Sequence, residues 1–237
     1  MVFVALAVVL GALFVRLGLW QLDRRSERRA INERMSSQLR RAPVPITGLL
    51  ADTDAVNRQA TVMGMPDLAN EVVVTGRSRN GSPGVHIFTP VRLPGRDTAV
   101  LVNRGWVYSP DAKSVDLNRW RETRTTFTGF TQRLVNVEPT GPAARASPAT
   151  QAIRVLSHPG IARLLPYPVS ALYLVARGSA AGDSVPVRIA APVLSDGPHL
   201  SYAIQWFAFA AIALIGAAAV VRRARQPTRD GAQLAKE

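Results

Sequence analysis

Three histidines are the residues of this 237-residue chain best able to bind a metal: His86, His158 and His199. The chain has no cysteine, which excludes disulfide bridges, a thiolate nucleophile and cysteine-ligated zinc or iron–sulfur sites. A metal cluster built from histidine alone would need all three residues, which stand far apart in the sequence. We expect His86 and His158 to be ordinary surface or core residues.

His199 opens a segment that also carries two aromatic residues, Tyr202 and Trp206. On a helix that advances about 100° per residue, Trp206 lies on the same face as His199, and Tyr202 lies about 60° away. That face could stack a planar apolar cofactor. The alternative is that the same side chains anchor the chain at the depth of the lipid headgroups, where amphipathic aromatic residues collect. The residues alone leave both interpretations open.

A second group of candidate residues stands early in the chain. Trp20 and Arg24 are four residues apart and therefore share one face of a helix. Arg24, or its neighbour Arg25, could pair with a carboxylate of a ligand or of an acidic partner. Anchoring and extension of the helix are the alternative. Residues 103–106 read Asn-Arg-Gly-Trp, where a glycine inside an apolar strand indicates a bulge or a close backbone approach. This motif could serve the structure or form a binding surface.

The sequence carries no motif typical of an enzyme. It has no Gly-x-Ser-x-Gly elbow, no His-Glu-x-x-His helix, no glycine-rich phosphate loop and no paired-carboxylate motif. We therefore expect a protein that is not an enzyme.

Two apolar segments near the ends of the chain predict membrane helices. Residues 2–15 contain no charged side chain, and neither do residues 201–221. A helix needs about 20 apolar residues to cross a bilayer, so the second segment is long enough by itself. The first is long enough if Arg16 snorkels to the lipid surface. A cleaved signal peptide is the alternative for the first segment, but no basic residue precedes it and no small-x-small site follows it.

The two predicted helices have small residues at the spacing that allows close packing. Ala7 and Gly11 are four residues apart in the first, and Ala213 and Ala217 are four apart in the second. We expect the two helices to touch.

The predicted orientation rests on segment length, because basic residues follow both spans. Positive charge directs mainly loops shorter than about 60 residues, and longer segments are translocated largely regardless of charge. The segment between the spans is far longer than that. We expect a multi-pass protein with its first transmembrane helix over residues 1–22, its second over 199–221, an extracytoplasmic domain over 43–198 and a cytoplasmic basic tail over 222–237.

The charge of +13 and the sequence pI of about 11.5 could indicate a nucleic-acid partner. Much of the charge stands beside the predicted spans, where anionic headgroups attract arginine by roughly 1 kcal/mol each. No nucleic-acid-binding motif accompanies it. We expect the lipid bilayer, and no nucleic acid, as the partner of these basic residues.

The central segment predicts a helix followed by strands. Residues 23–42 form a juxtamembrane helical extension, because residues 23–41 lack glycine and proline and two prolines follow at Pro43 and Pro45. Six strands are expected beyond it, each short, rich in β-branched or aromatic residues and bounded by turn residues: Val72–Thr75, Val85–Val91, Ala99–Val107, Thr125–Thr131, Leu172–Ala176 and Val185–Ala190.

The connections complete the predicted fold. Residues 80–84, Asn-Gly-Ser-Pro-Gly, predict a hairpin with a longer loop. Residues 153–165 predict a short helix broken by Pro159 and Gly160, and residues 138–149 read as a loop. Long strand–helix alternation is absent, which argues against a doubly wound parallel sheet. The expected fold is an α+β membrane protein whose two transmembrane helices flank an antiparallel β-rich domain, either a sheet or a partly closed barrel.

Four stretches of the chain resemble one known family. In order they are residues 19–24 (Leu-Trp-Gln-Leu-Asp-Arg), 89–90 (Thr-Pro), 101–107 (Leu-Val-Asn-Arg-Gly-Trp-Val) and 199–207 (His-Leu-Ser-Tyr-Ala-Ile-Gln-Trp-Phe). They resemble the Surfeit-locus-one family of membrane proteins that assist the assembly of haem–copper cytochrome oxidases. Each motif is weak alone, but their joint order and position are specific.

The resemblance implies a function. It suggests an assembly factor for cytochrome c oxidase in the bacterial inner (plasma) membrane that binds haem a transiently and presents it to the catalytic subunit, with that subunit and haem a synthase as partners. It places the suspected iron ligand at His199, with Tyr202, Trp206, Trp20 and Arg24 as further cofactor-binding candidates. The alternative is a membrane-anchored scaffold that stabilises an oxidase intermediate through protein contacts without binding haem.

Overall fold

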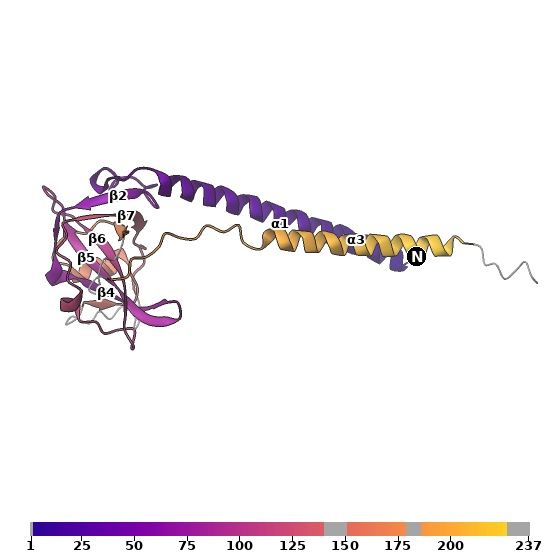
Figure 1. Cartoon of the computed structure of the whole chain (residues 1–237). Coiled ribbons are helices and arrows are strands. Elements are labelled where there is room, and N and C mark those ends of the chain that lie inside the picture. The colour runs from indigo at the N-terminus through magenta and orange to yellow at the C-terminus, as the bar shows by residue number, and fades with distance from the viewer. Residues whose placement is uncertain (1, 140–150, 179–185, 227–237) are drawn as a thin grey trace, which may run out of the picture. The chain divides into compact units, whose positions relative to one another are not determined.

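The structure, a computed structural model, describes residues 2–139, 151–178 and 186–226 (Figure 1). The chain divides into two compact units. The helix unit contains the N-terminal helix up to Arg34 and the chain from Leu194 onward, and the sheet unit contains Met35–Val193. Both predicted spans therefore fall in the helix unit, and all the predicted strands fall in the sheet unit.

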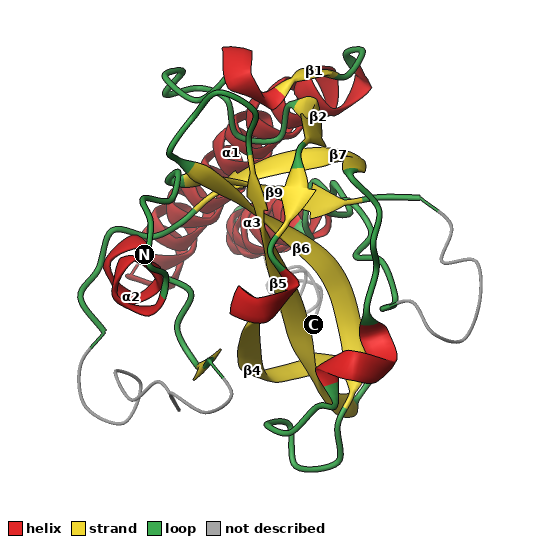
Figure 2. Ribbon diagram, turned by 90° about the vertical axis from the view of Figure 1, so that its left-hand side faces the viewer, coloured by secondary structure: helices red, strands yellow, loops and turns green. Residues whose placement is uncertain are grey.

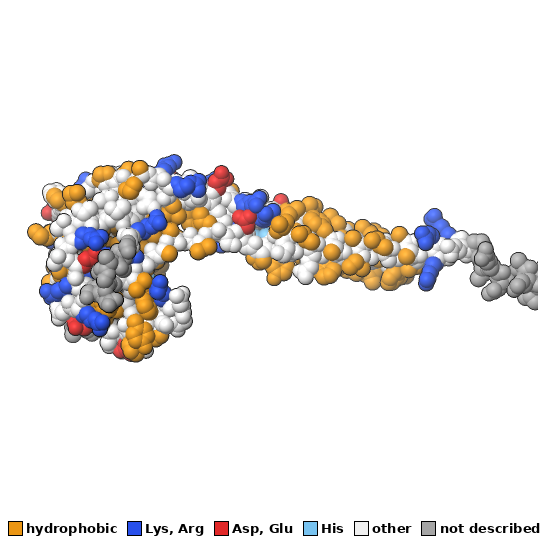
Figure 3. Space-filling view, in the orientation of Figure 1, with side chains coloured by type: hydrophobic (Ala, Val, Ile, Leu, Met, Phe, Trp, Pro, Cys, Tyr) orange, Lys and Arg blue, Asp and Glu red, His pale blue; other side chains and the backbone are white. Residues whose placement is uncertain are grey.

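The helix unit consists of α1 (Val2–Arg40), up to Arg34, and α3 (His199–Ala224). Both helices are long and apolar enough to cross a membrane. Hydrophobic side chains cover their visible surface, and basic side chains stand at the ends of this apolar stretch (Figure 3). α1 continues from the first apolar segment through the predicted juxtamembrane helix without a break. This confirms the helical extension expected from residues 23–41.

Small residues line the contact between α1 and α3. The buried residues are Ala7, Gly11 and Gly18 on α1 and Ala203, Ala210 and Ala217 on α3. A Cβ atom on Gly18 would lie 2.6 Å from the ring of Phe207, and one on Gly11 would lie 3.1 Å from the Leu214 side chain. Both glycines therefore let the two helices approach closely. The seven-residue spacing of the alanines on α3 is typical of helices that pack in a left-handed pair. Of the predicted small residues, only Ala213 is half-buried rather than buried.

In its described part, the sheet unit contains nine strands in one sheet (Figure 2). Their bounds are β1 Val44–Pro45, β2 Gln59–Met63, β3 Met65–Pro66, β4 Val72–Arg79, β5 Ser82–Arg92, β6 Ala99–Tyr108, β7 Thr126–Arg133, β8 Ala152–Ile153 and β9 Leu172–Ala176. The order across the sheet is β1-β2-β7-β9-β6-β5-β4-β8, and β3 pairs with β5 off this path. The helical pieces of the unit are α2 (His158–Leu164) and the 3₁₀ turns Ile46–Gly48, Leu68–Asn70 and Leu117–Trp120.

The sheet is mixed, which corrects the expected antiparallel sheet. The pairs β1–β2, β4–β8 and β6–β9 are parallel, and the other pairs are antiparallel. The decisive strand is β9, which lies between β6 and β7. Its direction makes it parallel to β6 and antiparallel to β7.

Five of the six predicted strands correspond to β4, β5, β6, β7 and β9. The prediction of a strand over Val185–Ala190 is wrong for the described residues 186–190, where Val187 forms only an isolated bridge with Trp106. Val185 itself lies outside the described residues, as do residues 140–149 of the predicted loop. The strands β1, β2, β3 and β8 were not predicted, because segments of two to five residues give too little alternation to recognise.

Two turn predictions are refined by the structure. The hairpin between β4 and β5 is confirmed, but Asn80 and Gly81, with φ of 51° and 81°, close it in two residues instead of a longer loop. The short helix α2 begins at His158, where the Ser157 hydroxyl accepts a hydrogen bond from the backbone N–H of Gly160. Pro159 stands in its first turn, where a missing N–H costs nothing. Pro159 and Gly160 therefore lie in the first turn of this helix, and the prediction that they break it is wrong.

Apolar side chains are buried on both faces of the sheet. On β6, Val100 and Val102 pack in one core cluster with Phe127, whereas Leu101 between them packs in another with Phe88. Successive side chains of a strand point to opposite faces, so this division shows that β6 is covered on both sides.

Candidate functional site

His199 and Gln21 meet where α3 begins beside α1. The Nδ1 atom of His199 lies 2.9 Å from Oε1 of Gln21. An amide oxygen can only accept a hydrogen bond, so Nδ1 carries the proton and donates it. In the neutral imidazole the other ring nitrogen, Nε2, then holds the lone pair, and no hydrogen bond engages it among the described residues. Gln21 therefore orients the half-buried imidazole with Nε2 available as a ligand atom.

Trp206 lies on the same side of α3 as His199 and also faces α1. Its ring stacks on Phe14 of α1, with centroids 5.7 Å apart and ring planes at 24°. It meets Phe209 edge-on, with centroids 5.9 Å apart and planes at 77°. The structure thus places His199 and Trp206 on one face, but uses the indole for packing between the helices.

The other candidate residues lie on the surface of the helix unit. Trp20 and Tyr202 are 50% and 48% exposed. The guanidinium of Arg24 donates to Glu27 at 2.6 Å, one helical turn along α1. No hydrogen bond or ring contact joins these three residues to His199 in the part of the chain that the structure describes.

A charged cluster ties the segment before α3 to α1. The Nε atom of Arg29 donates to Asp196 at 2.6 Å, and Nε of Arg25 lies 3.6 Å from the same carboxylate oxygen. Asn32 donates to the carbonyl of Ser195 at 3.0 Å. The hydrogen bond from Arg29 and the charges of both arginines hold the pKa of Asp196 below its ordinary value. Because the start of α3 follows within a few residues, these contacts help to position the imidazole.

Sequence reasoning did not identify Gln21 and Asp196 as partners in this site. Asp196 is the one acidic residue in residues 186–226, and it is far in sequence from Arg25 and Arg29, with which it pairs. The signal that could have predicted this pairing is a single acid just before the second span and a run of arginines just after the first. For Gln21 the signal was an amide beside Trp20 in the motif at residues 19–24. The described residues contain no group of three or more side chains that could hold a metal ion.

In the sheet unit, the motif at residues 103–106 is part of a buried ion network. Arg104 is fully buried, and its guanidinium donates to Glu71 at 2.6 Å and to Thr89 at 2.7 Å. It also donates to the carbonyl of Trp120 and lies 3.7 Å from Glu122. Burial raises the pKa of the Glu71 carboxyl, and the Arg104 guanidinium opposes that rise. The structure assigns Arg104 to the interior, in agreement with the structural interpretation of this motif.

Gly105 shows both features expected of it. The β5–β6 register shifts between Ile87 and Phe88, opposite this glycine, so a bulge is present. Gly105 has φ of 133°, and a Cβ atom there would lie 2.4 Å from the carbonyl oxygen of Val187. Arg188 completes the contact by donating to the backbone carbonyl of Arg104 on β6, and it also donates to Glu122 at 2.6 Å. The motif therefore holds the segment around residues 187–188 against β6.

Comparison with known proteins agrees with these motifs. The sequence pattern of the SURF1 family matches residues 8–211. Uncharacterized SURF1-like proteins of Mycobacterium bovis and Mycobacterium tuberculosis are 29% identical to the chain over 226 residues, covering 90% of this chain and 80% of theirs. The match begins within α1, spans the sheet unit and ends within α3. The chain belongs to the SURF1 family, and this membership implies membrane association and a role in cytochrome c oxidase assembly.

Proposed function

We propose that the chain is a membrane-anchored chaperone that binds haem a through His199 during assembly of the oxidase catalytic subunit. The observation that carries the proposal is the hydrogen bond from His199 Nδ1 to Gln21 Oε1 at 2.9 Å, while Nε2 forms no hydrogen bond with any described residue. A neutral imidazole oriented by a hydrogen bond on its other nitrogen is the usual form of a histidine ligand.

The donor set fits a haem. A porphyrin supplies four nitrogens to its iron, so a single protein imidazole completes an axial position and no cluster of ligands is needed. The exposed rings of Trp20 and Tyr202, and the apolar surface of the two helices, suit the macrocycle. Arg24 and Arg25 suit its propionates, because guanidinium groups bind carboxylates with charge-assisted hydrogen bonds. When bound, the haem supplies only the redox centre that the oxidase will use.

The same site favours release. His199 is half-buried, and it is the one side chain that would hold the iron in this proposal. Arg25 and Arg29 already share Asp196, so their pairing with a propionate competes with an existing ion pair. A chaperone has to give up its cargo to the catalytic subunit, and a site with few, replaceable contacts allows this. We further propose that haem a synthase delivers the haem to this site.

The proposal also fixes an orientation. We place residues 43–198 outside the cytoplasm and both ends of the chain inside it. The chain has no cysteine of its own, so single cysteines can report on topology without background. Asn118→Cys, at an exposed position, is expected to react with a membrane-impermeant maleimide on intact spheroplasts, whereas Arg225→Cys is expected to react only after lysis. Labelling in the reverse order would contradict the orientation.

The haem proposal is tested by expressing the whole chain in a bacterial host with and without a co-expressed haem a synthase. We expect haem a to co-purify with the detergent-solubilised chain only when the synthase is present, and chromatography of the extracted haem identifies it. Purified chain that carries no haem a, but that still captures the oxidase catalytic subunit, would support the scaffold alternative.

A further inference from the structure

We propose a second ligand site, for an apolar organic acid with an aromatic body, in a cavity of the sheet unit. The cavity has a volume of about 600 Å³, within the range of small-molecule sites. All of its lining residues belong to the sheet unit, from Val74 to Pro192. The site is therefore independent of the proposed haem site at His199.

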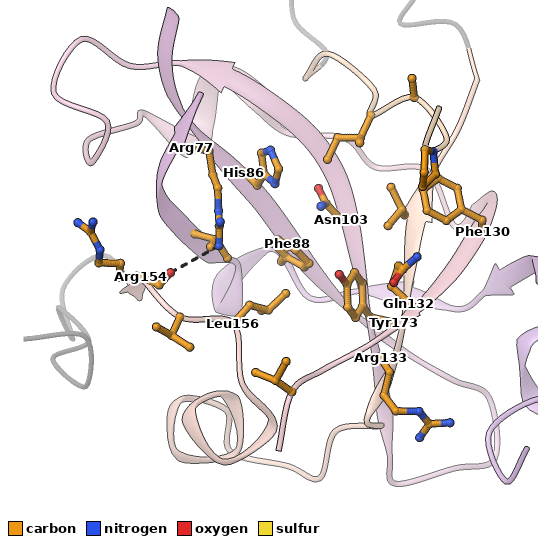
Figure 4. A pocket seen from close by; sticks show the side chains of 17 residues that line it. Arg77, His86, Phe88, Asn103, Phe130, Gln132, Arg133, Arg154, Leu156 and Tyr173 are labelled. Atoms are coloured by element: carbon orange, nitrogen blue, oxygen red, sulfur yellow. Dashed lines mark hydrogen bonds between the residues drawn. The ribbon is translucent and has the colours of Figure 1, made fainter. Parts of the chain in front are cut away.

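Four polar side chains from β4, β5, β6 and β9 surround the cavity: Arg77, His86, Asn103 and Tyr173 (Figure 4). All four can donate hydrogen bonds. The side-chain oxygen of Asn103 already accepts from the backbone N–H of Gly105 at 3.0 Å, which orients its NH₂ group for other partners. A site that offers several donors suits a ligand rich in acceptor oxygens.

Arg77 gives the cavity its charge. Its Nε atom is buried and lacks a hydrogen-bond partner within the described residues, and its Nη2 makes only a long contact of 3.5 Å with the carbonyl of Arg154. Arg133 and Arg154 add two more positive charges to the lining, and no aspartate or glutamate lines the cavity. None of these three arginines forms an ion pair among the residues that the structure describes. A partly buried, uncompensated guanidinium favours an anionic ligand.

His86 is consistent with an anion-binding role for Arg77. Burial, followed by the charge of Arg77, lowers the pKa of His86 to about 4, so the imidazole is neutral at pH 7. It thus adds a hydrogen-bonding group and no second charge beside the guanidinium. Of the three arginines on the lining, Arg77 is the partly buried one and Arg133 and Arg154 are exposed, so one carboxylate is enough to neutralise the buried charge.

The rest of the lining is apolar and aromatic. Phe88 and Tyr173 form an edge contact with ring centroids 5.6 Å apart, and Phe130 and Leu156 lie on the same cavity. Aromatic side chains prefer stacked or edge-to-face contacts with other rings, so this wall suits an aromatic body. A ligand whose carboxylate binds Arg77 and whose aromatic rings lie along this wall satisfies both the charged and the apolar part of the cavity.

The test uses the full-length chain in nanodiscs of uncharged phosphatidylcholine and the soluble probe 4′-fluorobiphenyl-4-carboxylate, followed by fluorine NMR. We expect saturable binding above that of empty nanodiscs, and about tenfold weaker binding of the matching neutral carboxamide, because one charge-assisted hydrogen bond is lost. Arg77→Gln is expected to weaken binding of the acid about tenfold as well. Arg96→Gln, which removes an exposed arginine outside the cavity, is expected to leave it unchanged.

Three further measurements make the outcome decisive. His199→Ala should bind the probe as the wild type does, which separates this site from the haem proposal. Arg77→Lys keeps the charge and should bind more tightly than Arg77→Gln, with thermal unfolding confirming that both variants fold. Equal binding of acid and carboxamide, or equal binding by Arg77→Gln and wild type, would overturn the proposal. Tighter binding of decanoate than of the biphenyl acid would overturn the inference that the ligand has an aromatic body.

Discussion

Replacing Arg104 with alanine is expected to lower the free energy of unfolding of the sheet unit by about 3–5 kcal/mol, the usual cost of removing one partner of a buried ion pair. Arg104 is fully buried and holds Glu71 at 2.6 Å and Thr89 at 2.7 Å. Its removal leaves the Glu71 side chain, 1% exposed, without its counter-charge, and it leaves the Trp120 carbonyl without its donor. An uncompensated buried carboxylate is far more costly than the hydrogen bonds alone.

The measurement is denaturant unfolding of the purified full chain in detergent, followed by near-ultraviolet circular dichroism of the sheet unit's aromatic residues. Arg96→Ala, which removes an exposed arginine, serves as the matched control and should change the free energy by less than about 0.5 kcal/mol. A loss below about 1 kcal/mol for Arg104→Ala would show that the ion network is not needed for stability.

Replacing His199 with alanine is expected to abolish function while leaving the fold intact. In cells that lack their own copy of the gene, the wild-type chain should restore haem a-containing oxidase, and His199→Ala should restore less than about a tenth of it, because the only oriented imidazole of the site is lost. Gln21→Ala keeps the His199 imidazole but removes the hydrogen bond that orients it. Residues that hydrogen-bond a metal-binding histidine in this way typically contribute 10–100-fold to metal binding. We expect an intermediate loss for Gln21→Ala.

The control for this experiment is His158→Gln, because His158 lies in the sheet unit, where its Nε2 bonds the carbonyl of Val169. It should restore the oxidase as well as the wild type at equal expression. Full rescue by His199→Ala at equal expression would mean that the chain assists the oxidase through protein contacts alone.

Local patterns predicted the parts of the fold that local physics decides. The apolar runs, the absence of glycine and proline after Asp23, and the Asn80–Gly81 turn each act within a few residues. The helix α1 and the β4–β5 hairpin therefore agree with expectation. Gly105 is a similar case, because a glycine inside an apolar strand has few uses other than a bulge or a close approach.

Pairings between distant segments were not predictable in the same way. The position of β9 between β6 and β7 depends on pairing with strands that are separated from it by 63 and 38 residues of chain, and no local signal specifies it. The segment 186–190 has the composition of a strand, but it is held to β6 by one bridge between Val187 and Trp106 and by the Arg188 side chain, which donates to the Arg104 carbonyl.

The candidate site shows the same division. Helical spacing was enough to place His199 and Trp206 on one face of α3. The contact of His199 with Gln21 depends on how two helices far apart in the sequence pack together, which in turn depends on Gly11 and Gly18. The sequence could name the imidazole but not the residue that orients it.

The absorption spectrum of the purified chain from a host that makes haem a tests the central claim most directly. Wild type, His199→Ala and His158→Gln are compared at equal protein concentration. If His199 presents Nε2 to the haem iron, the Soret absorbance per mole of chain should fall at least about tenfold in His199→Ala and should not change in His158→Gln. An unchanged Soret band in His199→Ala would contradict the assignment of His199 as the haem ligand.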